Sequence, residues 1–300
     1  MMHGKGVWVW YAAPCGTPEA MAAQAQAAGL SHVIIKVGDG GGFGDQFDRE
    51  VFRRQFAEYA PPLRAAGLRV LTWTYNYLED AAGEAAVVNW ALANGSEGHV
   101  FNPEIESEKR PAEADELLRL VREAHPGAFL AYAPLPVIDY HQDAPYVQFN
   151  AACQSVAPQF YPTAFKGEWP LPALWEQWDR WAGVWKAWGK PMPELLPLVE
   201  GYFAESPAVI AEFAAQAFER GVPGWSVWSW QHLTPETWAA IAAAPMSGAP
   251  AVVGAPEHPS VQAVALAHII EGEKLANTAA VNVREALWHF GAARELLTKG

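Results

Sequence analysis

The chain has 300 residues, of which 51% are hydrophobic, and its formal net charge is −13. This length and apolar content suffice for one large domain or two smaller ones, and they exclude a disordered chain. The acidic balance argues against a nucleic-acid partner, because a protein that binds phosphates needs a basic face. No apolar run reaches the roughly 18 residues of a membrane span, and we expect no signal peptide because the N-terminus lacks the required apolar segment.

Eight short runs rich in Val, Ile, Trp and Tyr recur along the chain, and helical stretches separate most of them. The helical stretches before the second and third runs stop at Gly29 and Gly67, and glycine is favoured directly after a helix. Runs of this composition between turn residues predict strands. The predicted strands are residues 7–11, 32–37, 69–77, 99–106, 128–132, 156–161, 195–200 and 225–230.

The number of strand–helix units favours one α/β architecture. Eight units in about 245 residues fit a (β/α)8 TIM barrel, which typically needs about 250 residues. A doubly wound sheet is the alternative, but residues 12–16 after the first strand lack its glycine-rich phosphate turn. The glycine-dense segment 38–44 lacks the Lys-Ser/Thr of a P-loop, and we interpret it as a mobile loop. The sequence therefore predicts a barrel over residues 1–245.

A short C-terminal helical extension is predicted beyond the barrel. Residues 246–259 are rich in Pro, Gly and Ala, which is typical of a linker. Residues 260–300 form two helical stretches, and apolar residues recur at steps of three and four from Val283 to Leu297. This tail is too small to hold a core alone. We expect it to pack on the barrel, or to dock to a partner or a second copy of the chain.

Cysteine, histidine and tryptophan usage narrows the chemistry. Cys15 and Cys153 are too few for a disulfide framework or a Cys-rich metal site, and we expect two buried thiols. The histidines are scattered without metal-ligand spacing, so no metal ion or other cofactor is expected. The 15 tryptophans are several times the usual number, and indole rings stack well on the apolar faces of sugars. Carbohydrate is therefore our first hypothesis for the ligand.

The end of the fourth predicted strand carries two carboxylates. Active sites of barrels form where the strands exit into their loops. Strand alternation places Glu104 and Glu106 on one face about 7 Å apart, together with Asn102. Two carboxylates held this close cannot both ionise readily, so one pKa should rise. A carboxylic acid beside a carboxylate is what the cleavage of a glycosidic bond needs.

The other predicted strand ends add amide, carboxylate and aromatic side chains, which together suit a sugar pocket. A serine nucleophile is not supported, because the chain has no G-x-S-x-G motif. Asp39 is a third candidate catalytic carboxylate, and Lys36 lies inside the same strand. The predicted substrate-binding residues are Asn102, Tyr75, Gln159, Tyr161, Glu200, Trp228, Trp230 and Gln231.

Residues 28–40, AGLSHVIIKVGDG, resemble the second-strand motif of the phage-type lysozymes of glycoside hydrolase family 25. The resemblance implies a barrel enzyme that cleaves peptidoglycan between N-acetylmuramic acid and N-acetylglucosamine. It places the family's fourth-strand acidic pair on Glu104 and Glu106, with Glu106 as the general acid. The family's last-strand Trp-Gln would correspond to Trp230 and Gln231.

Chitinase-like barrels are similar in other features. They carry acid-x-acid at the end of the fourth strand, a tyrosine on the sixth, here Tyr161, and a tryptophan on the eighth, here Trp228 or Trp230. The chain departs from both patterns. The first strand, W-V-W-Y, lacks the aspartate of family 25, and His99 and Asn102 stand where chitinases have further acidic residues.

Two hypotheses follow for the function. In the first, the protein is a lysozyme-like or endolysin-like hydrolase of a glycan of N-acetylhexosamines, above all peptidoglycan, and acts by carboxylate acid catalysis. In the second, it is a non-catalytic barrel that binds glycan or serves as a structural component and docks through its tail. Both make a polysaccharide or a docking protein the partner. We expect a protein that is cytoplasmic, released by lysis or carried in a phage particle.

Overall fold

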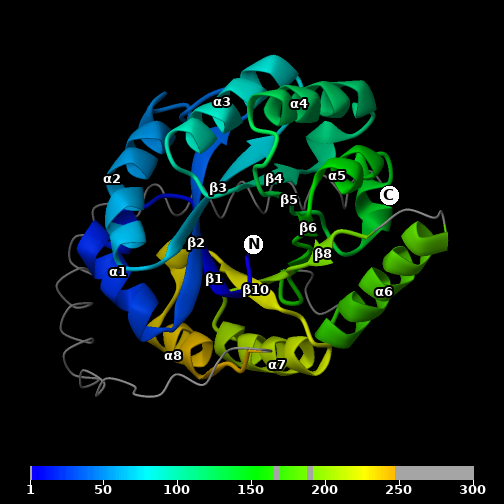
Figure 1. Cartoon of the computed structure of the whole chain (residues 1–300). Helices are drawn as coiled ribbons and strands as arrows, with labels where there is room; N and C mark the ends of the chain where they lie inside the picture. The colour runs from blue at the N-terminus through cyan, green and yellow to red at the C-terminus, as the bar shows by residue number, and fades with distance from the viewer. Residues whose placement is uncertain (1, 165–168, 188–191, 247–300) are drawn as a thin grey trace. The chain divides into compact units, whose positions relative to one another are not determined.

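The computed structural model describes residues 2–164, 169–187 and 192–246. The predicted linker 246–259 and tail 260–300 lie outside these residues, except for Met246. The described chain alternates strands and helices, and the strands lie inside a ring of helices (Figure 1). Within this part of the chain no helix is both long and apolar enough to cross a membrane.

All strand pairings in the sheet are parallel. The order of the segments is β7-β9-β10-β1-β2-β3-β4-β5-β6-β8. Their bounds are β1 (Gly4–Val9), β2 (Leu30–Asp39), β3 (Arg69–Asn76), β4 (His99–Pro103), β5 (Leu130–Tyr132), β6 (Ser155–Val156), β7 (Gln159–Phe160), β8 (Glu194–Leu195), β9 (Leu198–Glu200) and β10 (Gly224–Trp228).

The sheet closes through the pairing of two strands that are each interrupted at a proline. Pro158 separates β6 from β7, and Pro197 separates β8 from β9. Proline has no N–H for the ladder, so each strand is split there. β6 pairs with β8 and β7 pairs with β9, and the Leu198 N–H donates to the Pro158 carbonyl at 3.0 Å between the two pairs. With each interrupted strand counted once, the ten segments form the eight strands of the predicted barrel.

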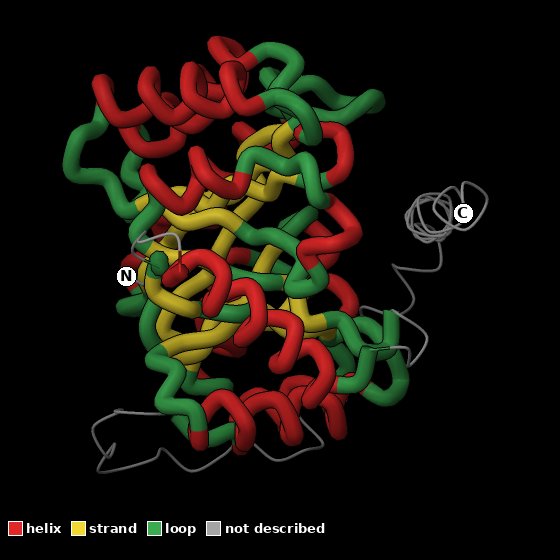
Figure 2. Tube along the Cα trace, turned by 90° about the vertical axis from the view of Figure 1, so that its right-hand side faces the viewer, coloured by secondary structure: helices red, strands yellow, loops and turns green. Residues whose placement is uncertain are grey.

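Helices cover the outer face of the sheet, as the tube view also shows (Figure 2). Thr17, Asp80 and Thr234 begin three of them as N-caps, and each side chain accepts a backbone N–H of the first turn. The helices are α1 (Pro18–Ala27), α2 (Val51–Ala65), α3 (Ala81–Ala93), α4 (Pro111–Ala124), α5 (Tyr146–Ala152), α6 (Leu171–Ala187), α7 (Ser206–Glu219) and α8 (Pro235–Ala243).

Strand alternation sorts the core into two layers. On β3, Trp73 and Tyr75 belong to the layer inside the barrel, whereas Val70 belongs to the layer between sheet and helices. The inner layer contains Trp8 and Trp228, whose rings lie 5.6 and 5.1 Å from that of Trp73. The interior is thus packed with side chains, as in other barrels of this kind. Both cysteines are free thiols, one buried and one half-buried.

Candidate active site

Aromatic rings surround the mouth of the barrel at the carboxyl ends of the strands. Trp228, at the end of β10, contacts the half-buried Trp10 with ring centroids 5.6 Å apart. Tyr161 and Tyr202 follow β7 and β9, and their rings lie 6.4 Å apart. These rings pack against the inner core layer. The polar side chains of the site therefore stand around an apolar floor.

The fourth strand ends earlier than the sequence predicted. β4 stops at Pro103, and a 3₁₀ turn, η2 (Ile105–Ser107), follows. The Ser107 N–H and hydroxyl both bond the Glu104 carbonyl, at 3.0 and 2.7 Å, and this closes the turn. Strand alternation therefore does not relate Glu104 to Glu106. The two carboxylates nevertheless stay near each other, since each of them contributes to the raised pKa of Tyr75.

Glu104 lies in a network of amides. Gln159 donates from Nε2 to Glu104 Oε1 at 3.0 Å and to Asn102 Oδ1 at 2.9 Å. The same nitrogen contacts the Ala133 carbonyl at 2.8 Å, which fixes the amide on the barrel wall. Three predicted residues, two from the fourth predicted strand and one from the sixth, thus meet at one point.

The environment of Glu104 disfavours its charge. Burial raises the pKa of Glu104 to about 7, and the neighbouring Glu106 carboxylate adds to the rise. Hydrogen bonds with Gln159 and Asn102 oppose the rise, because they stabilise the ionised form. The predicted rise of one pKa in the acidic pair falls on Glu104.

Glu106 has a different environment. Its side chain is exposed at the mouth, and its Oε2 accepts a hydrogen bond from the Tyr75 hydroxyl at 2.7 Å. Burial and the two nearby carboxylates raise the pKa of Tyr75, so the phenol keeps its proton and acts as the donor. The Glu104 carboxyl is therefore enclosed, whereas the Glu106 carboxyl is accessible to a ligand and is positioned by the Tyr75 hydroxyl.

Asp39 occupies the β2 side of the mouth, in contact with the Lys36 ammonium at 2.6 Å. Lys36 is fully buried, and its ammonium lies over the rings of Trp10 and Trp73, 4.3 and 4.9 Å from their centroids. Burial raises the pKa of Tyr77, and the nearby carboxylates of Asp39 and Glu106 add to the rise. Asp39 is thus the partner of a buried cation.

The remaining predicted residues separate into different places. Glu200 is fully buried and accepts the backbone N–H groups of Thr163 at 2.6 Å and Ala164 at 3.1 Å, so it ties β9 to the loop after β7. Trp230 belongs to the outer core layer, where its ring lies 4.8 Å from that of Trp238. Gln231 accepts the Trp10 N–H at 3.4 Å.

Two residues at the mouth were not among the predicted site residues. Trp10 forms part of the wall. It follows Trp8 by two residues in the predicted strand 7–11, so strand alternation could have placed both on the same face. His141 lies in η3 (Ile138–His141), with Nε2 3.8 Å from Glu104 and Nδ1 3.6 Å from Glu108. Burial lowers the pKa of His141 to about 4, so it is neutral near pH 7. The segment after β5 brings His141 beside these two carboxylates.

Comparison with known proteins gives no match at the level of sequence families, because no family model and no curated protein matches the chain. Solved structures do match. A class V chitinase from Pseudomonas fluorescens Pf-5 has a TM-score of 0.58 and 14% identity, over 80% of this chain and 98% of that chain. The spore cortex-lytic enzyme SleL of Bacillus megaterium QM B1551 has a TM-score of 0.52 and 10% identity, over 80% of this chain and 73% of that chain.

A third matching structure is that of an inhibitor protein. The xylanase-A-amylase inhibitor protein XAIP-III has a TM-score of 0.53 and 14% identity, over 81% of this chain and 98% of that chain. At such identities the likeness shows the fold. These comparisons support the resemblance to chitinase-like barrels and do not support the assignment to family 25 lysozymes. The chain is an α/β barrel with the fold of chitinase-like proteins.

Proposed function

We propose that this protein is a glycoside hydrolase that cleaves glycans of N-acetylhexosamines by carboxylate acid catalysis. The observation that carries the proposal is the pair of Glu104 and Glu106 at the mouth. Glu104 is enclosed and has a pKa of about 7, whereas Glu106 is exposed and accepts a hydrogen bond from the Tyr75 hydroxyl. Unequal environments of two neighbouring carboxyls separate an acid from a charge-stabilising role.

Glu106 is the general acid in this proposal. Its carboxyl is accessible, so it can give its proton to the leaving glycosidic oxygen. Glu104 lies deeper and, once ionised, stabilises the positive charge that develops on the sugar or activates the attacking group. Because two adjacent carboxylates repel each other, the pair retains one proton near neutral pH. Without substrate Glu104 holds this proton, with its pKa of about 7, so catalysis requires the proton to pass to Glu106 when the substrate binds. Asp39 has a supporting role, since its charge is already matched by Lys36.

The surrounding side chains suit a sugar substrate. Trp228 offers an aromatic floor that is 8% exposed, and the neighbouring Gln159, Asn102 and Tyr161 offer polar groups to hydroxyl and acetamido substituents. The matching structures include proteins named as a chitinase and a cortex-lytic enzyme. Within this substrate class we favour peptidoglycan, with chitin oligomers as the comparison.

A non-catalytic glycan-binding barrel is the second candidate. It is favoured by His99 and Asn102, which replace acidic residues of the chitinase pattern, and His99 is buried between the hydroxyls of Thr72 and Thr74 at 2.9 Å. The inhibitor named above has the same fold. This candidate predicts saturable glycan binding without bond cleavage.

The test is the release of reducing ends from purified peptidoglycan and from chitin oligomers. Glu106→Gln should lower turnover by at least about a hundredfold, because general acid catalysis contributes on the order of 10²–10⁴ in rate. Glu113→Gln, on the outer helix α4, is the matched control and should retain turnover. Unchanged turnover in Glu106→Gln would remove this residue as the acid. A wild-type protein that binds glycan but releases no ends would favour the second candidate.

A further inference from the structure

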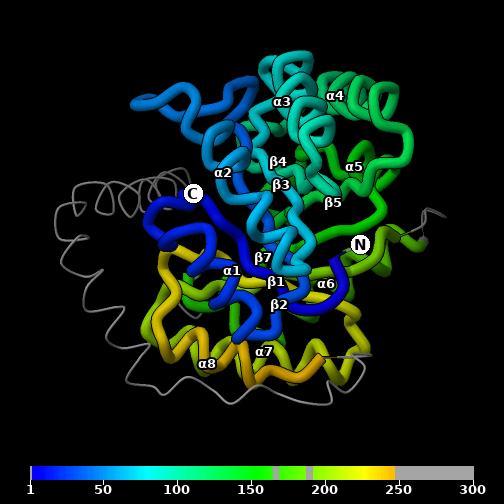
Figure 3. The backbone as a smooth tube through the Cα atoms, turned by 60° about the vertical axis from the view of Figure 1, so that its left-hand side comes forward, coloured from blue at the N-terminus to red at the C-terminus, as the bar shows by residue number. Residues whose placement is uncertain are grey.

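The loop between β2 and α2 presents a phenylalanine to solvent. Phe47 is 71% exposed, more than any other large hydrophobic side chain in the described part of the chain. This loop lies at the carboxyl end of β2, on the same face of the barrel as the acidic pair, and Figure 3 shows it in blue, projecting beyond α2. A single exposed apolar residue is ordinary on a protein surface. Whether Phe47 has a function therefore depends on where it lies and on how its backbone is held.

The backbone that carries Phe47 is held firmly. Asp45 Oδ1 accepts the N–H groups of Phe47 and Asp48, both at 2.8 Å. Its other oxygen, Oδ2, accepts the Tyr11 hydroxyl at 2.7 Å, which ties the loop to the end of the first strand. A side chain on a fixed backbone loses little further conformational freedom when a ligand covers it. The loop therefore presents the ring in a prepared position.

A row of aromatic rings joins this loop to the barrel mouth. Tyr11 stacks on Trp10 with an interplanar angle of 14° and ring centroids 6.2 Å apart. Trp10 in turn contacts Trp228 at 5.6 Å. The row thus runs from the floor of the site, over β1, to the residue whose hydroxyl supports the Phe47 loop.

The acidic residues of the loop are matched by nearby groups. Asp39 pairs with Lys36, Asp48 with Arg54 and Glu50 with Arg53, while Asp45 is occupied by the hydrogen bonds given above. A ligand of this loop therefore needs no charge of its own, which a neutral sugar unit fits. Phe43, the other aromatic residue of the loop, is turned inward against Trp90 with ring centroids 5.2 Å apart. The exposed ring is therefore too small an apolar patch for a protein interface and large enough for one sugar ring.

We infer that Phe47 is an outlying stacking platform for a sugar unit of a long glycan whose reacting part lies over Trp228. The inference rests on the proposed function for the identity of the glycan. It makes the protein prefer long oligosaccharides, because only a ligand that reaches both the mouth and the loop gains the contact with Phe47.

Binding in the Glu106→Gln background tests this without hydrolysis of the ligand. The dissociation constants of the dimer and the hexamer of N-acetylglucosamine are measured by calorimetry, with and without Phe47→Ala. The preference for the hexamer over the dimer should fall about two- to tenfold in Phe47→Ala, as expected for the loss of one stacking contact. Phe47→Trp should restore it. Phe218→Ala is the matched control, since Phe218 is 49% exposed on α7 and should leave the preference unchanged.

The outcomes separate this inference from the proposed function. An unchanged preference in Phe47→Ala, or no hexamer binding at all, overturns the platform, even where the wild-type protein releases reducing ends. A lowered preference in Phe47→Ala with no turnover in the wild type supports the platform and overturns the hydrolase. Retained thermal stability of Phe47→Ala shows that the loop change does not act through unfolding.

Discussion

At the scale of single residues, Glu104 occupies a place in the site where ionisation of its carboxyl is disfavoured. Its side chain is only 20% exposed, and its carboxyl lies beside a second carboxylate. Both features oppose ionisation, and the amide of Gln159 only partly offsets them. Residues held in unfavourable surroundings are common at functional sites, because activity rather than stability selects them.

Glu104→Gln should stabilise the protein in a pH-dependent way. The folded state holds the Glu104 proton up to a pKa of about 7, against 4.5 ordinarily, so wild-type stability falls as pH rises between these values. The full difference amounts to about 3 kcal/mol at most. The uncharged variant escapes this loss. Urea unfolding at about pH 4 and about pH 8 measures it, and an equal gain at both values would refute the stated cause.

The candidate site also shows the limit of residue-level prediction. Residues at strand ends were identifiable because parallel strands bring their carboxyl ends to one face. This argument correctly grouped Asn102, Glu104 and Gln159. It also selected Trp230, which packs against Trp238 instead, because β10 ends at Trp228 and Trp230 begins the 3₁₀ turn Trp230–His232, where strand alternation no longer applies.

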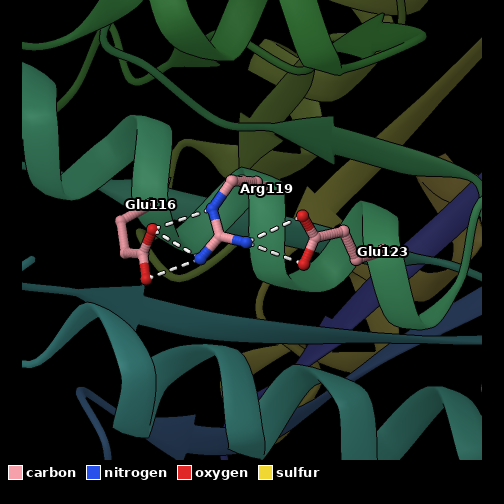
Figure 4. A network of polar contacts seen from close by, with 3 residues as sticks. All are labelled: Glu116, Arg119 and Glu123. Atoms are coloured by element: carbon pink, nitrogen blue, oxygen red, sulfur yellow. Dashed lines mark hydrogen bonds and ion pairs between the residues drawn. The ribbon is translucent and has the colours of Figure 1, made fainter.

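At the scale of elements, helix ends and helix surfaces contribute unequally to stability. Asp80 caps α3 by accepting the Gly83 N–H at 2.9 Å. On α4, Arg119 forms ion pairs with Glu116 at 2.8 Å and Glu123 at 2.7 Å (Figure 4). The cap satisfies a backbone donor that has no partner inside the helix, whereas the ion pairs are exposed and screened by salt.

The two elements therefore predict different mutational effects. Asp80→Ala should lower the free energy of unfolding by about 1 kcal/mol, because the capping bond is lost. Arg119→Ala should have a smaller effect that disappears in high salt, because long exposed side chains lose entropy when they pair. Denaturant unfolding at low and high salt measures both. A larger effect for Arg119→Ala than for Asp80→Ala would contradict this ranking.

At the scale of the whole molecule, closure of the sheet makes the barrel one cooperative unit. Trp73 of β3 is fully buried, and its indole N–H donates to the carbonyl of Val9 at the end of β1, at 3.0 Å. It contacts Trp8, Trp10 and Trp228, which come from the first and last strands. The ring therefore joins parts of the chain that are distant in sequence.

Trp73→Ala should lower the free energy of unfolding by about 3–5 kcal/mol, because it removes buried apolar surface and leaves a cavity. Trp169→Ala, at a half-buried position outside the inner layer, should have a smaller effect and serves as the control. Equilibrium unfolding followed by fluorescence and far-UV circular dichroism measures both variants. Similar losses in the two would contradict the central role of the inner tryptophans.

The sequence by itself determined the alternation of strands and helices, and with it the barrel and the face that carries the site. Those features depend on local periodicity and on the number of units, which are visible along the chain. Only the tertiary structure decided the closure through two proline-split strands and the turn that separates Glu104 from Glu106. The neighbours of each carboxyl, and hence the choice of Glu104 for the raised pKa, come from residues far apart in sequence. Proximity and burial arise from packing, so no local pattern encodes them.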